Sequence, residues 1–243
     1  MLFDSDTPYR DMYDCRIYAF QKVHEFFRAR ANLTKSQESR ACYFIRYVAV
    51  FLVMTKVDIN PRTTAYPMPV VIVGATVDSK PNFMAVAWFT KVNSNPPMML
   101  IAVGKKQYTG EGIKANKTFS INLPGKNLVA ETDYVGIVSG RKEDKSRIFD
   151  VFYGDEKTAP MIKECPLNYE LKLVDTVEVP GSNLFIGEIT NAYVDQEKTQ
   201  GHQPDLLAIE PFILVETPAN HYYHLGSQLA DAFKVGKALS TEK

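Results

Sequence analysis

A short stretch of the chain carries side chains that could bind an anion. These side chains follow the apolar run 98–103 and belong to Lys105, Lys106, Tyr108 and Thr109. The next residues predict a short helix over 111–115, with the Thr109 hydroxyl as a cap for its first turn. A cationic strand end that leads into a helix N-terminus is a favourable place for a phosphate group. A solvated basic turn is the alternative, and the residues by themselves leave both open.

The elements that must position these side chains are antiparallel strands. Apolar, β-branched runs separated by turn signals lie at 70–77, 82–89, 98–103 and 118–122. Two longer segments with alternating apolar residues, 167–177 and 184–195, predict a hairpin that turns at Pro180-Gly181-Ser182. We also expect a last strand over 209–215, a short helix over 127–134 and a terminal helix over 228–239.

Composition excludes several classes of function. The chain has 243 residues, of which 28 are Lys or Arg and 28 are Asp or Glu, so no global field favours nucleic acid or an anionic membrane. Its three cysteines form no Cys-x-x-Cys pair, which favours a reducing compartment. The first residues are acidic where a secretory signal is basic, and the apolar run 43–54 is too short to span a bilayer. We therefore expect a soluble, cytoplasmic protein.

An ordered series of segments resembles the flavin reductase-like family of FMN-binding split barrels, and within it the flavoredoxin branch. The segments are Asn82-Phe-Met-Ala-Val-Ala-Trp88, Asn93-Ser-Asn-Pro-Pro97, Gly104-Lys-Lys-Gln-Tyr-Thr109, Thr118-Phe-Ser-Ile-Asn122 and Asp133 to Lys145. The similarity runs from about Pro61 to about Leu239. It implies a mainly β, Greek-key split β-barrel with short peripheral helices over residues 56–243.

Residues 1–55 form an atypical N-terminal extension outside this resemblance. They are rich in arginine and aromatic residues and lack the proline and glycine punctuation of the remainder. Three interpretations stay open: an arm that binds a partner or embraces a dimer, a loosely attached or poorly ordered helical segment, or a product of an upstream start codon.

The resemblance implies which residues bind FMN noncovalently. The turn after the third strand meets the phosphate, through Lys105, Tyr108 and Thr109. Strand ends that supply backbone amides and side chains to the flavin ring contain Ala87, Trp88, Phe89, Asn93, Ser94 and Pro97. Asn122 holds the ribityl chain, Tyr222 caps the pocket, and a Ser-Gly loop approaches the cofactor with Ser139, Gly140 and Lys145. We expect the turn at Thr109 and the strand end at Trp88 to converge on one pocket.

Simpler interpretations of several of these residues stay open. Trp88 is the only tryptophan and would also serve as a core anchor. Asn122 at a strand end is otherwise a common turn former, and the Ser-Gly loop would otherwise be an ordinary charged loop. His221-Tyr-Tyr-His224 lacks a third ligand, so we predict no metal site. Cys165 is expected to be a small buried residue.

No acid, base or nucleophile is assigned, because the chain has no Rossmann fingerprint, P-loop or nucleophile elbow. Hydride transfer between a nicotinamide and a flavin needs alignment more than an acid or base. The implied function is a homodimeric FMN-binding oxidoreductase that passes electrons from NAD(P)H or a protein donor to a small acceptor or a redox partner protein. One alternative is an FMN electron carrier without reductase activity. Another, an oligonucleotide-binding barrel, is disfavoured because basic and aromatic residues are not interleaved on the strands.

Overall fold

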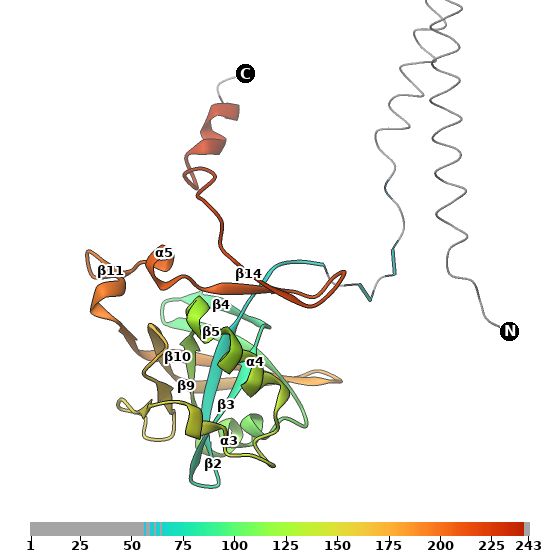
Figure 1. Cartoon of the computed structure of the whole chain (residues 1–243), viewed down its shortest axis with the longest axis vertical. Coiled ribbons are helices and arrows are strands. Elements are labelled where there is room, and N and C mark those ends of the chain that lie inside the picture. Colours follow the sequence, from blue (N-terminus) through green and yellow to red (C-terminus); the bar gives the residue numbers. More distant parts are fainter. Residues whose placement is uncertain (1–55, 57–58, 61, 64, 241–243) are drawn as a thin grey trace, which may run out of the picture. The chain divides into compact units, whose positions relative to one another are not determined.

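One curved antiparallel sheet forms the body of the protein (Figure 1). The computed structural model describes residues 56, 59, 60, 62, 63 and 65–240, and from Thr63 onward they belong to one compact unit. The sheet has seven strands, which in spatial order are β3 (Lys80–Val86), β2 (Val71–Val77), β6 (Thr118–Leu123), β9 (Leu167–Glu178), β10 (Ser182–Val194), β5 (Pro97–Gly104) and β4 (Phe89–Ser94). The mainly β class predicted from the sequence is confirmed.

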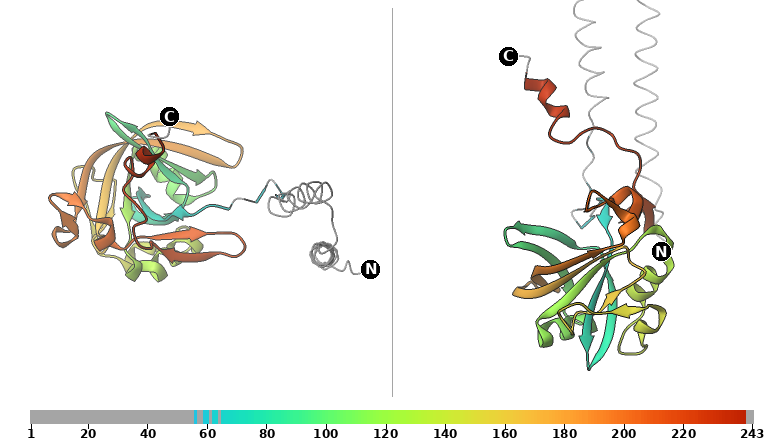
Figure 2. Two further views of the ribbon diagram at one scale, coloured as in Figure 1. Left: turned by 90° about the horizontal axis from the view of Figure 1, so that it is seen from above. Right: turned by 90° about the vertical axis from the view of Figure 1, so that its left-hand side faces the viewer.

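The two edge strands of this sheet, β3 and β4, are consecutive in the chain. Only Ala87 and Trp88 lie between them, and the amide of Ala102 on β5 donates to the Trp88 carbonyl at 2.8 Å. A link this short keeps the two edges within about 11 Å of each other, since an extended residue spans at most about 3.6 Å. The sheet must therefore curl, as Figure 2 shows. The prediction of one continuous strand over 82–89 is wrong, because the chain passes from one edge strand of the sheet to the other at Ala87 and Trp88.

Alternation along the strands produces two apolar layers. Inward side chains fill the curled sheet, and this core consists of Val71, Val73, Ala75, Val86, Ile101, Val103, Ile113, Phe119, Ile121, Leu171 and Phe185. Outward side chains of β2 and β3 pack under a second layer, in the cluster of Ile72, Phe83, Leu128, Val135, Phe149, Ile162 and Cys165. Cys165 is buried as expected.

Short helices and small sheets surround the main sheet. The helices are α3 (Tyr108–Asn116), α4 (Val129–Ile137) and α5 (Leu206–Ile209), with 3-10 turns η2 (Lys126–Leu128), η3 (Lys145–Ile148), η4 (Gln196–Lys198) and η5 (Val235–Ser240). A three-stranded sheet contains β1 (Met68–Pro69), β13 (Phe212–Val215) and β14 (His221–His224). Two small hairpins consist of β7 (Val151–Phe152) with β8 (Met161–Ile162) and β11 (Thr199–Gln200) with β12 (Gln203–Pro204).

Three sequence predictions differ from the structure. Thr109 does not cap α3, because the N-cap residue is Gln107, which makes no side-chain cap bond, and Thr109 lies inside the helix. The helix predicted over 127–134 begins as the 3-10 turn η2 and continues as α4 to Ile137. The terminal helix predicted over 228–239 is wrong: the described segment forms only the 3-10 turn η5, and Leu229 and Phe233 are exposed because no other element packs on them.

The strand predicted over 209–215 proves to be β13, which is preceded by the short helix α5. The described part of the chain contains no helix of the length and apolarity that a bilayer crossing requires. Predictions for residues 1–55 fall outside the described residues. The cytoplasmic location stays a prediction.

Asn122 joins four segments inside the protein. Its side-chain NH2 group donates to the Ile72 carbonyl at 2.9 Å, and its Oδ1 accepts from the Ile162 amide at 3.1 Å and from Asn168 Nδ2 at 2.8 Å. The residue has no exposed surface. A buried amide whose partners are all within the protein stabilises the fold mainly because its removal would leave those partners unpaired.

We expect Asn122→Ala to lower the free energy of unfolding by about 2–4 kcal/mol, because buried donors and acceptors would lose their partners. Urea denaturation followed by circular dichroism measures the change. The matched control is Asn127→Ala on exposed η2, with an expected change within about 0.5 kcal/mol. Equal stabilities of the two variants would contradict the structural role of Asn122.

Candidate functional site

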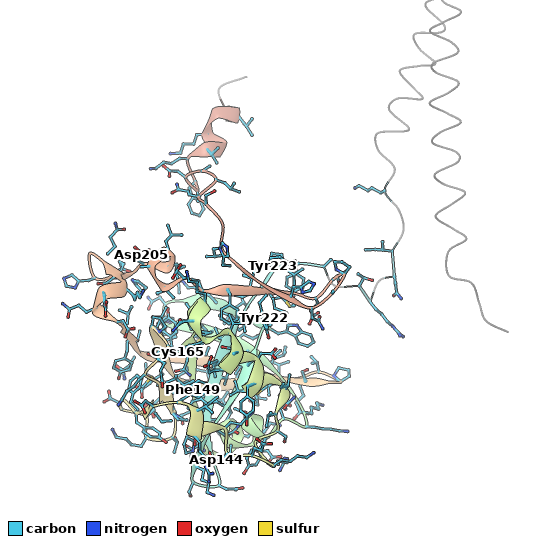
Figure 3. All side chains as sticks on the ribbon, in the orientation of Figure 1. Asp144, Phe149, Cys165, Asp205, Tyr222 and Tyr223 are labelled. Atoms are coloured by element: carbon cyan, nitrogen blue, oxygen red, sulfur yellow. The ribbon has the colours of Figure 1, made fainter. Side chains whose placement is uncertain are left out.

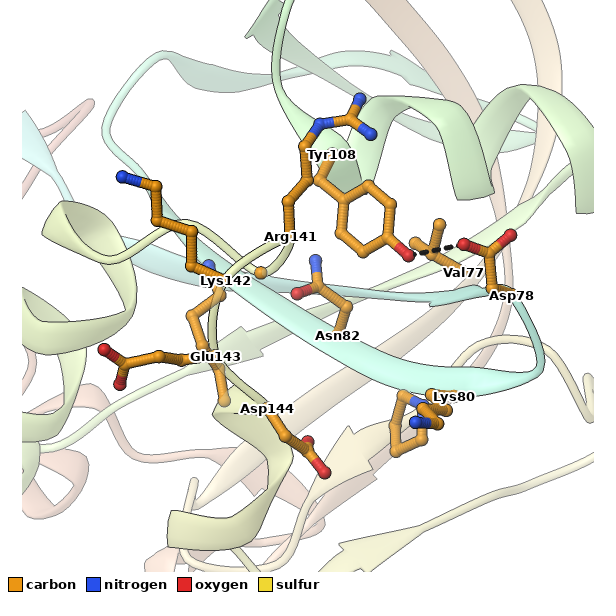
Figure 4. Close-up of a pocket in the computed structure, with 12 residues that line it drawn as sticks. Val77, Asp78, Lys80, Asn82, Tyr108, Arg141, Lys142, Glu143 and Asp144 are labelled. Carbon is orange, nitrogen blue, oxygen red and sulfur yellow. Dashed lines mark hydrogen bonds between the residues drawn. The ribbon is translucent and has the colours of Figure 1, made fainter.

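A pocket of about 620 Å3 lies between the β2–β3 turn, the start of α3 and the loop 139–145 (Figure 4). Its size falls within the roughly 300–1,000 Å3 typical of small-molecule sites. Its walls are formed by Val77, Asp78, Lys80, Pro81, Asn82, Tyr108, Gly140, Arg141, Lys142, Glu143, Asp144 and Lys145. Three of the predicted cofactor-binding residues, Tyr108, Gly140 and Lys145, therefore meet here.

Tyr108 connects the three walls of the pocket. Its hydroxyl donates to Asp78 of the β2–β3 turn at 2.7 Å, and the Arg141 guanidinium lies 4.7 Å from the centre of its ring (Figure 4). Arg141 also pairs with Glu111, one turn further along α3. The hydrogen bond to Asp78 raises the pKa of Tyr108 above its ordinary value, because ionisation would place two negative charges side by side. The Tyr108 side chain therefore stays neutral and forms a fixed part of the pocket wall.

Asn82 forms the back of the pocket and links it to Thr109. Its Nδ2 donates to the Thr109 hydroxyl at 2.7 Å, and both residues are buried. The loop approaches Asn82 so closely that a Cβ atom at position 140 would collide with the Asn82 side chain, so glycine is required there. Thr109 thus supports the pocket wall from behind and does not line the pocket.

Lys145 lies in the pocket wall with only 4% of its surface exposed. Its ammonium donates to the carbonyls of Val135 and Val138, at 3.0 and 3.1 Å, at the C-terminal end of α4. Burial lowers the pKa of Lys145 to about 8, because the charged form loses hydration.

The acidic and the basic groups around the pocket differ in whether they have hydrogen-bond or ion-pair partners. Its carboxylates have partners: Asp78 bonds to Tyr108, Glu143 to Tyr134, and Asp144 to Ser146. By contrast, the ammonium groups of Lys80 and Lys142 have no hydrogen-bond or ion-pair partner among the described residues. The pocket can therefore offer two free cations to an anionic ligand.

Trp88 does not line this pocket but belongs to an apolar surface of the sheet. Because Ile101 points inward, its neighbours on β5 point outward, and the strand register places them beside outward residues of β9 and β10. We call this surface the outer apolar face, and it contains Trp88, Met98, Leu100, Ala102, Val177, Leu184 and Ile186. Trp88 is 53% exposed. The packing of α3 and α4 is concentrated on β2 and β3, at the other side of the sheet.

The other predicted residues lie in three places. Phe89 is the first residue of β4 and packs against the core, whereas Asn93, Ser94 and Pro97 are exposed around the β4–β5 turn. Lys105 is not free, because its ammonium lies 3.3 Å from Glu178. Ala87 is half-buried beside Trp88, and Ser139 is exposed at the start of the pocket loop.

Two further predicted residues are held by contacts within the chain. Asn122 has no surface to offer a ribityl chain, so this assignment needs correction: its amide groups are used inside the fold. Tyr222 donates to Asp133 of α4 at 2.9 Å, and Figure 3 shows it on the opposite side of β14 from Tyr223. Burial and this hydrogen bond raise the pKa of Tyr222 to about 12. Tyr222 thus fixes β14 to α4.

Sequence reasoning missed the residues that give the pocket its charge. It places Lys80 in a turn, and Arg141 and Lys142 in a charged loop. The signal that could have found them is the cluster of three basic residues in Arg141-Lys-Glu-Asp-Lys145, next to the glycine that lets the loop approach a strand.

Comparison with known proteins identifies relatives of this fold. The family model for the flavin reductase like domain matches residues 63–212. Flavoredoxin from Methanosarcina acetivorans is 46% identical, with a TM-score of 0.74 over 76% of this chain and 100% of that chain. Flavoredoxin of Desulfovibrio vulgaris (Miyazaki F) is 35% identical, with a TM-score of 0.70 over 75% and 100% of the two chains.

A third solved structure is similar in fold alone. A putative flavin reductase with split barrel domain from Shewanella frigidimarina is 24% identical, with a TM-score of 0.63 over 71% of this chain and 92% of that chain. The predicted split-barrel fold is thereby confirmed. Because the family model covers more than half of the chain, and the curled sheet and its flanking helices match flavoredoxin, the protein belongs to the flavin reductase-like family, close to flavoredoxin.

Proposed function

We propose that the protein is an FMN-dependent oxidoreductase of the flavin reductase and flavoredoxin type. It moves electrons from NAD(P)H or a protein donor, through noncovalently bound FMN, to a small acceptor or a partner protein. The observation that carries the proposal is the pocket with two unpaired lysines, on a fold whose family reduces flavins. An electron carrier without NAD(P)H activity is the second candidate, favoured by the likeness to two flavoredoxins.

The pocket fits the phosphate end of FMN. A phosphate needs cations and donors, and Lys80 on the β2–β3 hairpin and Lys142 on the loop 139–145 both line the pocket with free ammonium groups. Arg141 keeps further N–H donors beside its pairing with Glu111. The acidic groups of the same walls have partners, which limits their repulsion of an anion.

The flavin ring needs an apolar, aromatic wall, and Trp88 offers such a wall at the link between β3 and β4. Trp88 lies up to about 20 Å along β3 from Asn82 of the pocket, so a ring stacked on it is not that of an FMN whose phosphate lies in the same copy's pocket. Its indole is half exposed, so stacking on a planar ring would remove apolar surface from water. Asn93 and Ser94 are exposed but lie at the other end of β4, beside the β4–β5 turn.

The chain's own contribution to the reaction is binding and alignment. Bound FMN would supply the two-electron chemistry. Lys80 and Lys142 would neutralise its phosphate. Because its hydrogen bond to Asp78 keeps Tyr108 neutral, this side chain would place no negative charge beside the phosphate. No side chain needs to transfer a proton to carbon, because hydride transfer depends on distance and orientation.

We further propose that two copies of the chain associate through the outer apolar face. The equivalent surface on β2 and β3 is covered by α4 and the 145–165 segment. On the outer apolar face, Trp88 and Val177 are 53% and 44% exposed. Exposed contiguous apolar patches commonly mark interfaces. A second copy would cover this face and shield a ring stacked on Trp88.

Lys142→Ala should weaken FMN binding roughly tenfold or more, since a charge-assisted hydrogen bond contributes about 1.5–3 kcal/mol. Quenching of flavin fluorescence on titration gives the dissociation constant. Lys163→Ala removes an equally exposed lysine outside the pocket and should leave binding unchanged. Equal affinities of the two variants would refute the phosphate placement.

The reductase and the carrier differ in their response to nicotinamides. Anaerobic stopped-flow mixing of the FMN-loaded protein with NADH, and separately with NADPH, should bleach the flavin absorbance within seconds, because hydride transfer requires only that the nicotinamide and the flavin be aligned. Dithionite, which needs no binding site, is the control for reducibility. Bleaching by dithionite with neither nicotinamide active would favour the electron carrier.

Leu100→Asp should convert the dimer into monomers, because a charge in the middle of an apolar interface is costly to bury. Light scattering after size-exclusion chromatography measures the mass. Leu207→Asp changes an exposed leucine on α5, away from the outer apolar face, and should leave the dimer intact. A monomeric unmodified protein, or a dimer in both variants, would contradict the assigned interface.

A further inference from the structure

We propose that Lys145 is a positioning residue: its ammonium ties the cationic loop Ser139–Asp144 to the end of α4, and FMN retention therefore depends on the protonation of this one lysine. The inference rests on the proposed function, because it concerns the same pocket. It assigns to Lys145 a role distinct from direct cofactor contact.

The geometry of the tie is specific. The ammonium of Lys145 bonds to the carbonyls of Val135 and Val138, which precede the loop, while Lys145 itself follows the loop. One buried group therefore fixes both ends of the segment. Carbonyls of a last helical turn lack partners within the helix, and a cation there is favoured by the helix dipole. The two hydrogen bonds of Lys145 therefore stabilise the end of α4 as well as the loop.

The tied loop delivers the positive charge of the pocket. It carries Arg141 and Lys142 into the wall of the pocket, to which the β2–β3 hairpin contributes Lys80 (Figure 4). Backbone bonds from Lys142 and Glu143 to the Ser139 carbonyl keep the loop compact. A shift at its ends would displace both cations together.

The charge of the Lys145 side chain changes within the physiological range of pH. Burial lowers the pKa of Lys145 to about 8, so the ammonium is present below that pH and is lost as the pH rises through it. The neutral amine keeps two N–H donors but no longer carries the charge that faces the helix end and adds to the pocket's positive field. Anion binding should therefore be strongest below pH 8 and weaken above it.

Three other groups at or beside the pocket have a shifted pKa. From α3, Tyr108 has a pKa raised by its hydrogen bond to Asp78; from α4, Tyr134 has a pKa raised by its hydrogen bond to Glu143. Within the loop, the hydrogen bond from Ser146 lowers the pKa of Asp144. The remaining charged groups at the walls are Asp78, Lys80, Arg141, Lys142 and Glu143, with Glu111 behind Arg141.

Titration of the FMN phosphate cannot cause FMN binding to weaken as the pH rises through 8. Its second ionisation lies near pH 6, so the ligand gains negative charge as the pH rises and would bind a cationic pocket more tightly. Weakening near pH 8 has the opposite sign and points to the protein.

The test measures the FMN dissociation constant by fluorescence quenching, over roughly 1.5 pH units on either side of 8. The unmodified protein should bind roughly three- to tenfold more weakly at the alkaline end. Lys145→Arg keeps a permanent charge and should bind well without a step near pH 8. Lys145→Met should bind weakly throughout, also without the step. Lys163→Met is the matched control and should keep the unmodified profile.

Each outcome separates the two proposals. FMN binding with no step near pH 8 in the unmodified protein, or a step retained in Lys145→Arg, overturns the role of Lys145 and leaves the proposed function standing. Absence of FMN binding at every pH overturns the proposed function itself. Thermal melting checks that each variant folds, and if Lys145→Met does not, the unmodified protein and Lys145→Arg still decide the question.

Discussion

The two-residue link between the edge strands β3 and β4 is the constraint on which the rest of the structure depends. Seven strands in one sheet would normally leave two distant edges, but Ala87 and Trp88 can bridge only a few ångströms. The sheet must therefore curl around its inward side chains. The same closure places Trp88 at a corner where its indole cannot point into the core. An aromatic side chain on the outside is thus a direct consequence of how the barrel closes.

Closure also explains why the outer surface of the sheet is apolar. A curled sheet has an inner face that it covers itself and an outer face that something else must cover. On β2 and β3 the cover is α4 and the 145–165 segment, which bury Phe83 and Phe149 against each other. On β5 and β10 the chain supplies no comparable layer in its described part. We connect this asymmetry with the proposed dimer and with the proposed seat of the flavin ring.

The pocket beside the sheet depends on electrostatics more than on shape. Its lysines and carboxylates are nearly balanced in number, so a count of charges would predict little affinity for an anion. Affinity for an anion depends instead on which charged groups already have partners within the protein: the carboxylates have them, and two of the lysines do not. Lys145 illustrates the same principle in another form: its charge is directed to helix carbonyls, and its influence on a ligand passes through the loop that it holds.

The sequence alone determined the strands, the long β9–β10 hairpin and the family, because alternation, turn residues and ordered motifs are local properties of the chain. It also indicated Tyr108, Gly140 and Lys145, which do meet in one pocket. Only the tertiary structure decided that Asn122 is enclosed in the core, that Thr109 supports Asn82 from behind, and that Lys80 and Lys142 line the same pocket. The physical reason is that partnership and burial depend on residues distant in the chain, and no local pattern specifies which side chain reaches which partner.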